Sequence, residues 1–184
     1  MIKVGGSTRR DFIFPTSVEH AIAFYDDLDR IVSCLSHISM VERFAPNEMR
    51  VMYNTKELGT YQIHIYSDLQ TAVDYKEKVL YVNAADNHPP VRSHSSFNSC
   101  GSHGLFRSTS RFMPFGGHTR VIYEVELRAD LPTPSGLRFV PGRVLDKIAS
   151  NITNGRIDEI INGFITQSIT ALPIFLAERG IKNN

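Results

Sequence analysis

Apolar and polar residues alternate along several stretches of the chain, and this pattern predicts a largely β structure. Between positions 61 and 65 the odd residues are Tyr61, Ile63 and Ile65, and the even ones are polar. Between 119 and 129 the apolar parity consists of Val121, Tyr123, Val125 and Leu127. A period of two residues is typical of a strand with one buried face and one solvated face. Further strands are expected at about 11–14, 38–44, 48–54, 60–67, 79–84 and 105–112.

The strand at 119–129 is unusually long for a globular protein. At about 3.4 Å per residue it spans roughly 35 Å. A turn at 114–117 joins it to the strand at 105–112. A hairpin of this length has to curl, so we expect a curved antiparallel sheet.

One helix is expected before the sheet, from Ser17 to about Leu35. Its apolar positions recur at intervals of three and four: Ala21, Phe24, Leu28, Ile31, Val32 and Leu35. Ser17 can cap its first turn, and Glu19 is favourable at the positive end of the helix dipole.

The C-terminal segment has a helical period whose phase changes near its middle. Two apolar groups lie almost half a turn apart at about 100° per residue: Leu145, Ile148 and Ile152 form the first, and Ile160, Phe164 and Ile165 with Ser168 form the second. Glycine is costly inside a helix but common just after its end. We therefore expect a break at Asn154 and Gly155, with a longer second helix that Pro173 kinks or ends.

Length, charge and cysteine content set the broad class of protein. A chain of 184 residues with a net charge of +1 is expected to be soluble, with no overall bias toward nucleic acid or anionic membranes. Its two cysteines indicate reduced thiols rather than a disulfide framework. We expect residues 1–10 to be a disordered extension and residues 11–184 to form a single domain.

The polar loop at 87–100 holds residue types that suggest chemistry, but their spacing favours none. His88, His94, Cys100 and His103 match no compact zinc-ligand pair. A nucleophilic Cys100 beside His103 would also need an orienting third group. We therefore predict no metal, no cofactor and no catalytic residue in this loop.

Several phrases of the sequence resemble a known family. FYDDLDRIVSCL, MRVMYNTKELGTYQIHIYSDLQT, FNSCGSHGLFRS, TRVIYEVELRADLPTPSGLRF and ITNGRIDEIINGFI are similar to uncharacterised proteins of cyanobacteria and plastid-bearing eukaryotes, over about residues 10–179. That family is a domain of unknown function in the START-like SRPBCC superfamily, and it has no assigned catalytic residue to carry over.

The resemblance implies an α+β fold of the helix-grip (START-like) type, with a curved antiparallel sheet wrapped around a long C-terminal helix. It also implies a cavity between sheet and helix for a lipid, pigment, hormone or polyketide-like molecule. A cytoplasmic location follows from it as well, in the cyanobacterial cytosol or the plastid stroma.

The alternation and the implied fold together predict a ligand-binding set of side chains. It comprises Tyr61, Ile63, Ile65, Phe106, Ser108, Phe112, Tyr123 and Val125 from the strands, Ile160 and Phe164 from the helix, and Phe97 as a lid. Ligand pockets combine apolar walls with a few oriented polar groups. Tyr61 and Tyr123 are expected to orient the polar end of the ligand in a void of about 300 Å³ or more, bounded in part by Phe164.

The favoured function is a non-catalytic binding protein for a hydrophobic small molecule such as a lipid, isoprenoid or pigment. One alternative is an enzyme acting on such a ligand, with His64 or a tyrosine as its titratable group. Another is an interaction or assembly factor with a filled core. The expected partners are the small molecule and, transiently, a membrane surface or another protein, and no nucleic acid.

Overall fold

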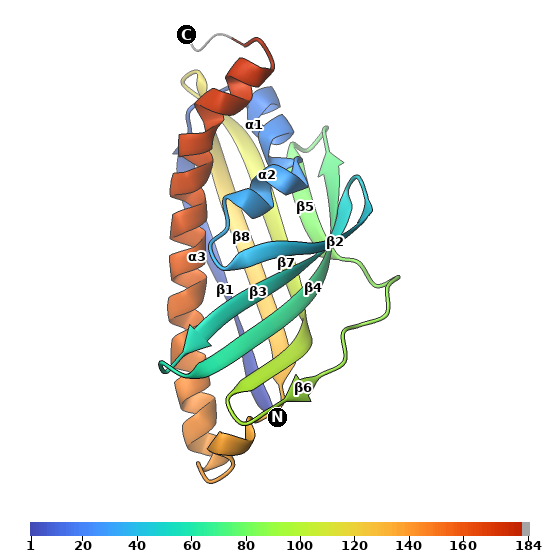
Figure 1. Cartoon of the computed structure of the whole chain (residues 1–184). Coiled ribbons are helices and arrows are strands. Elements are labelled where there is room, and N and C mark those ends of the chain that lie inside the picture. Colours follow the sequence, from blue (N-terminus) through green and yellow to red (C-terminus); the bar gives the residue numbers. More distant parts are fainter. Residues whose placement is uncertain (182–184) are drawn as a thin grey trace.

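The computed structural model describes residues 1–181 and contains one sheet, two short helices and a long C-terminal helix (Figure 1). The elements follow one another as β1 (Ile2–Phe14), α1 (Val18–Tyr25), α2 (Leu28–Ser33), β2 (Ile38–Ala45), β3 (Glu48–Glu57), β4 (Tyr61–Asp74), β5 (Val79–Ala84), β6 (His94–Ser95), β7 (Ser99–Phe115), β8 (His118–Leu131), the 3₁₀ turn η1 (Ser135–Leu137) and α3 (Gly142–Glu178). The predicted strands and the last hairpin are present, and the hairpin is longer than expected.

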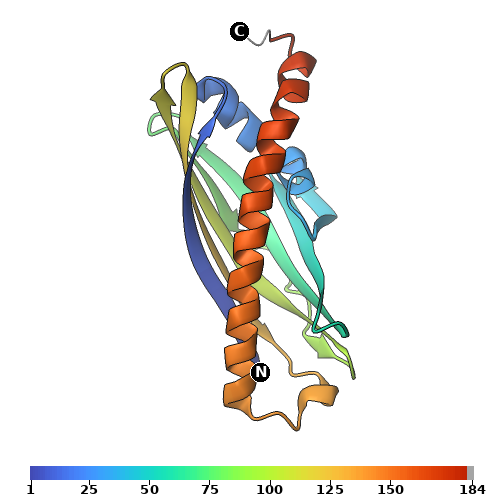
Figure 2. The ribbon, with the colours of Figure 1, turned by 90° about the vertical axis from the view of Figure 1, so that its left-hand side faces the viewer.

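The eight strands form one sheet in the order β1-β8-β7-β5-β4-β3-β2, with β6 on the side of β7. Neighbouring strands are antiparallel, except that the start of β7 runs parallel to β4, from Gln62 opposite Ser99 to Tyr66 opposite His103. The sheet curves, and α3 lies across its open side (Figure 2). Of all the strands, β1 makes the most contacts with α3. The predicted fold class, a curved antiparallel sheet around a long C-terminal helix, is confirmed.

The prediction of a disordered extension at residues 1–10 is wrong, because β1 pairs with β8 from Ile2 onward. Residues 1–10 are poor in apolar side chains because some of them serve contacts with α3. A Cβ atom on Gly6 would lie 2.9 Å from Cδ1 of Ile157, so the absence of a side chain lets the helix approach. Arg10 donates to the Asp158 carboxylate at 2.5 Å. Glycine and arginine therefore occupy positions on the half-buried face of β1, where apolar residues would be expected.

The single helix expected from Ser17 to Leu35 is two helices. The Ser17 hydroxyl caps α1 as predicted, accepting from the amide of His20. Asp26 ends this helix, and the Asp27 carboxylate caps α2 by accepting from the amide of Arg30 at 3.1 Å. Asp26 and Asp27 therefore stop one helix and start the next.

The break predicted at Asn154 and Gly155 is also wrong, since α3 runs unbroken from Gly142 to Glu178 and continues through Pro173. Its apolar stripe changes side because the curved sheet offers different contacts along the helix. Leu145 packs into a small cluster at the start of α3, whereas Phe164 lies in the main core. Gly155 is exposed and has open space around its Cα.

By length and composition alone, α3 is apolar enough to cross a membrane. Core helices of water-soluble proteins pass the same criterion. The apolar residues of α3 that face the sheet are buried in the main core, among them Ile160, Ile161, Phe164 and Leu172.

Aromatic side chains fill the space between the sheet and the C-terminal half of α3. The ring of Phe24 lies 5.2 Å from that of Phe175, and the ring of Phe164 lies 5.6 Å from Tyr25 and 5.3 Å from Tyr123, between centroids. These side chains are almost fully buried. The corresponding space beside the N-terminal half of α3 contains no such aromatic cluster.

Candidate functional site

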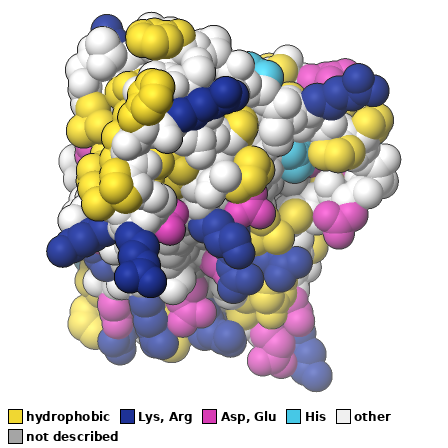
Figure 3. All heavy atoms as spheres, turned by 90° about the horizontal axis from the view of Figure 1, so that it is seen from below, with side chains coloured by type: hydrophobic (Ala, Val, Ile, Leu, Met, Phe, Trp, Pro, Cys, Tyr) yellow, Lys and Arg dark blue, Asp and Glu magenta, His cyan; other side chains and the backbone are white. Residues whose placement is uncertain are grey.

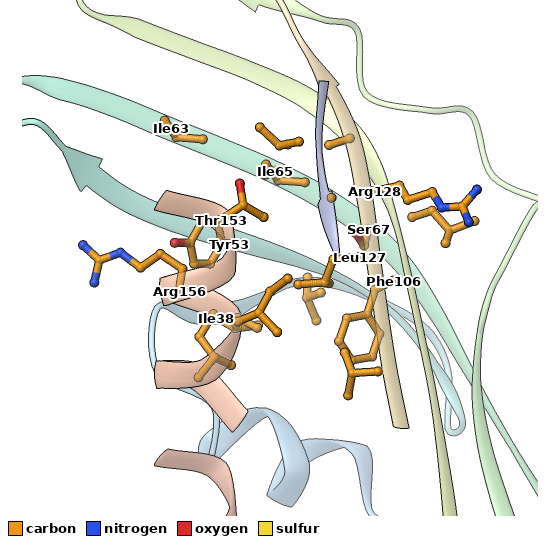
Figure 4. A pocket seen from close by; sticks show the side chains of 18 of the residues that line it. Ile38, Tyr53, Ile63, Ile65, Ser67, Phe106, Leu127, Arg128, Thr153 and Arg156 are labelled. Carbon is orange, nitrogen blue, oxygen red and sulfur yellow. The ribbon is translucent and has the colours of Figure 1, made fainter. Parts of the chain in front are cut away.

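A cavity of about 120 Å³ lies between the N-terminal half of α3 and the concave face of the sheet. Aliphatic side chains form most of its wall (Figure 4). Ile63 and Ile65 come from β4, Val125 and Leu127 from β8, and Ile157 and Ile160 from α3. These branched side chains are smaller than the aromatic rings of the other half of the core, so the helix and the sheet enclose space between them.

The alternation of the strands positions this wall. On β4 the residues Ile63, Ile65 and Leu69 point inward, whereas His64 and Asp68 point to the convex face. Phe106 of β7 closes the side nearest the aromatic core. The one small polar group on this stretch of β4 is Ser67, whose hydroxyl donates to the carbonyl of Gly104 at 3.2 Å.

Charged and hydroxyl groups form one edge of the cavity, which we call the polar rim: Tyr53, Glu57, Thr153 and Arg156. Nε of Arg156 lies 2.8 Å from Oε1 of Glu57, which also accepts from the Thr55 hydroxyl at 3.0 Å. Arg156 also pairs with Glu159, which lies 3.5 Å from Nε2 of His37. The rim therefore joins α3 to the end of β3 through an ionic network.

The ionic network favours the charged forms of Arg156 and Glu159. The hydrogen bonds that Arg156 donates to the carboxylates of Glu57 and Glu159 raise the pKa of its guanidinium. Arg156 in turn lowers the pKa of the Glu159 carboxyl. Burial raises the pKa of the Tyr53 hydroxyl, so this group stays protonated near neutral pH and can donate a hydrogen bond.

Five of the predicted binding residues line the cavity: Ile63, Ile65, Phe106, Val125 and Ile160. Four others lie in the filled core instead, namely Ser108, Phe112, Tyr123 and Phe164. Tyr123 has Ser108 as its hydrogen-bond partner, and burial raises the pKa of its hydroxyl to about 12. A void of 300 Å³ beside Phe164 is therefore not present, since the cavity is smaller and lies further along the helix.

Tyr61 and Phe97 lie beyond the cavity, beside η1. A Cβ atom on Gly136 would lie 3.3 Å from the Tyr61 hydroxyl oxygen and 2.9 Å from the Phe97 carbonyl oxygen. The Phe97 side chain is 74% exposed. The Phe97 ring faces solvent and does not line the cavity, so its position does not match that of a lid.

The loop at 87–100, which contains Phe97, lies against the convex face of the sheet over its first part. Arg50 donates to the carbonyl of Pro89 at 2.8 Å, and Nε2 of His88 lies 2.7 Å from Oε1 of Glu48. The amide of Val91 donates to Nδ1 of His103 at 3.3 Å. These contacts fasten the loop on the side opposite α3.

The residues considered for metal or catalytic chemistry lie apart from one another. Cys100 points into the small apolar cluster at the start of α3, where burial raises the pKa of its thiol. His64 lies on the convex face with its ring 6.5 Å from that of His94. Within residues 1–181 no three histidine, cysteine or carboxylate side chains come together as a metal site.

Sequence reasoning missed the polar rim. Neither Glu57 nor Arg156 is among the side chains predicted to bind the ligand. The available signal was the spacing of Arg156 and Glu159, which marks an ion pair along a helix. Nothing in the sequence indicates that the arginine of this pair also reaches β3, 99 residues earlier in the chain.

No family model matches this chain, and no curated protein matches it. Among solved structures, it is similar to the Zhui aromatase/cyclase of a Streptomyces species (8% identity, TM-score 0.56), over 92% of this chain and 94% of the other. It is also similar to TTHA0849 of Thermus thermophilus (15%, 0.53; 90% and 99% covered) and to human StAR-related lipid transfer protein 5 (10%, 0.52; 92% and 76% covered). At these identities the likeness shows the fold alone, and the chain has the START-like helix-grip fold.

Proposed function

We propose that this protein binds a hydrophobic small molecule, without catalysis, in the cavity beside the N-terminal half of α3. The observation that carries the proposal is an almost wholly aliphatic wall that ends in one polar rim. An apolar wall with a few placed polar groups is the common composition of small-molecule sites. A lipid, isoprenoid or pigment has the matching chemistry, and the name of the StAR-related lipid transfer protein supports this class.

The charges of the rim favour a neutral ligand. Two arginines line the cavity, and carboxylates already neutralise both: Arg156 pairs with Glu57 and Glu159, and Arg128 pairs with Glu126, so neither guanidinium is free for an acid. A carboxylate ligand would be repelled there, whereas an alcohol or carbonyl can bond to the Tyr53 hydroxyl. We therefore propose a neutral molecule with one hydroxyl or carbonyl end.

The size of the cavity sets a condition on binding. Its volume of about 120 Å³ is below the roughly 300 Å³ at which ligand pockets usually begin. A larger ligand would have to displace side chains, and the contact between Arg156 and Glu57 is the one that holds the helix and β3 together at the rim. The ligand is proposed to enter there.

The test uses ligands that differ only at the polar end. Thermal shift and fluorescence titration would compare a long-chain alcohol with the acid of equal length, and an isoprenoid alcohol with its acid. We expect the alcohols to bind more tightly. Native mass spectrometry of protein purified from its own source would identify any retained molecule.

A cavity-filling variant shows whether binding occurs inside. Ile65→Phe should abolish alcohol binding, because the side chain lines the cavity. The matched control is Ile13→Phe, at a position on β1 that is 38% exposed. Equal binding by both variants would contradict an interior site.

Two alternatives stay open. The small volume favours an interaction or assembly factor with a filled core, and co-purification of a protein with no small molecule would support it. The second alternative is an enzyme. It is favoured by Glu57, the one acidic side chain in the cavity wall as described, because a carboxyl group can act as a general acid or base. Chemical change of a bound ligand would support it. A cytosolic or stromal location is proposed on the sequence resemblance alone.

A further inference from the structure

Exposed apolar side chains gather at the end of the molecule where α3 begins. Phe139 is 95% exposed, Phe97 74% and Val144 47%. Phe139 and Val144 flank the first residue of α3, and Phe97 belongs to the segment beside η1. We call residues 137–147 together with Phe97 the basal tip. Large apolar side chains exposed in one place often mark an interaction site.

The local fold holds these side chains outward. Leu137 and Val140, on either side of Phe139, pack against the small cluster formed by Ile2, Cys100, Leu131 and Leu145. The amide of Val140 donates to the carbonyl of Leu137 at 3.0 Å. The amide of Gly136 donates to the carbonyl of Phe97 at 3.2 Å, which joins the two segments. With its neighbours fixed inward, Phe139 has no buried position available.

Positive charge surrounds the exposed rings. Between residues 137 and 147 the chain carries Arg138, Arg143 and Lys147 against one acid, Asp146. None of these four side chains belongs to an ion pair among the residues that the structure describes. The first turn of α3 has no side-chain cap, so the positive end of its dipole adds to the same surface. Seen from this end, hydrophobic side chains lie beside lysine and arginine side chains, and acidic side chains are present on the same face (Figure 3).

We propose that the basal tip docks on an anionic lipid surface. Aromatic rings enter the boundary between headgroups and acyl chains, and lysine and arginine are attracted to anionic lipids. The tip projects at one end of the molecule (Figure 2), and none of its residues lines the cavity described above. A protein partner usually buries its anchor residues in pockets, and single-stranded nucleic acid usually follows a charged groove. A projecting tip instead fits a surface that can deform around it.

The docking proposal does not depend on ligand binding, although the two features adjoin. Leu131 lines the cavity and also belongs to the cluster beneath the basal tip. When the protein is docked, this end of the cavity would therefore lie against the lipid surface. Vesicle binding can be measured with no ligand present, so failure of either proposal is distinguishable from failure of the other.

The experiment measures sedimentation of the full chain with vesicles of phosphatidylcholine, with and without phosphatidylglycerol. We expect binding to the anionic vesicles and a decrease with added salt. Phe139→Ser should weaken it about tenfold, because an inserted ring is lost. Arg143→Glu should weaken it about fivefold or more. The matched controls, Phe115→Ser and Arg111→Glu, lie toward the opposite end of the β7–β8 hairpin and should bind as the unmodified protein does.

A second measurement reports insertion directly, because the chain contains no tryptophan. Phe139→Trp should shift its emission to the blue on anionic vesicles, and Phe115→Trp should not. The proposal is overturned if no vesicles bind, if neutral vesicles bind equally well, or if the control variants lose as much binding. Binding of the tip to nucleic acid or to a protein, with none to vesicles, would also overturn it.

Discussion

Arg156 of α3 and Glu57 of β3 form an ion pair across the rim of the cavity, with 2.8 Å between Nε and Oε1. Glu57 is the last residue of β3, and its side chain is only 9% exposed. The pair therefore connects the long helix to the end of β3 that lies beyond its pairing with β2. If the cavity holds a ligand, this contact has to open for the ligand to enter.

Arg156→Met should loosen the rim. Glu57 would be left buried with the Thr55 hydroxyl as its remaining hydrogen-bond partner, and we expect a loss of about 1 kcal/mol in the free energy of unfolding. Exchange of a bound fluorescent alcohol should become faster. Urea denaturation and stopped-flow release measure the two effects.

The matched control for the rim is Arg120→Met. Arg120 forms an exposed ion pair with Asp11 on the convex face, away from the cavity. Because exposed pairs contribute little, neither stability nor release should change by much. Release that is equally fast in both variants would show that Arg156 does not control access.

Tyr123→Phe separates the filled core from the cavity. The Tyr123 hydroxyl is buried with Ser108 as its partner, so its loss should lower the free energy of unfolding by about 1 kcal/mol and leave ligand retention unchanged. Phe106→Ala should change retention, because Phe106 lines the cavity. Weaker retention in Tyr123→Phe would show that the ligand reaches the aromatic core.

Gly155→Ala should stabilise the protein by about 0.5–1 kcal/mol. Gly155 lies inside α3 with open space around it, so alanine gains helix propensity and meets no neighbour. Gly104→Ala should instead destabilise it by about 1–3 kcal/mol, because the new Cβ would lie 2.7 Å from Cγ2 of Ile65 and 2.9 Å from the Arg128 carbonyl oxygen. Chemical denaturation of both variants gives the comparison. A lower midpoint for Gly155→Ala would indicate a helix end at that position.

The period of the sequence predicted the strands and their buried faces, because alternation depends only on neighbouring residues. It assigned Val125 and Tyr123 to the same concave face, as the structure shows. It could not say which lines a cavity and which lies in a filled core. That depends on where the aromatic residues of α1 and α3 meet the sheet, which is a property of the whole fold.

The errors arose where a tertiary contact overrides a local rule. The phase change in α3 predicted a break because one straight helix would carry apolar stripes on opposite sides, and the curved sheet does meet Leu145 and Phe164 on different sides of one unbroken helix. Gly6 and Arg10 made the first half of β1 look disordered, because each serves a contact with α3. Neither contact leaves a periodic pattern in the sequence.

The last prediction concerns acid stability, and it rests on the loop that covers the convex face. Nδ1 of His103 accepts from the amide of Val91, and Nε2 lies 3.8 Å from the Asp68 carboxylate. Burial lowers the pKa of His103 below its ordinary value of 6.5, and this outweighs the opposing effect of Asp68. The folded protein therefore binds a proton at this site less readily than the unfolded chain does.

A lowered histidine pKa makes the folded state less stable in acid. The free energy of unfolding should fall as the pH drops from about 6.5 through the folded pKa, because the unfolded chain takes up the proton first. Protonated Nδ1 also cannot accept from Val91, so hydrogen exchange of the Val91 amide should accelerate over the same range. His103→Asn should reduce the slope of stability against pH in this window, whereas His118→Asn, at an exposed position in the β7–β8 hairpin, should leave it unchanged. An identical slope for His103→Asn and the unmodified protein would show that this contact does not link the loop to pH.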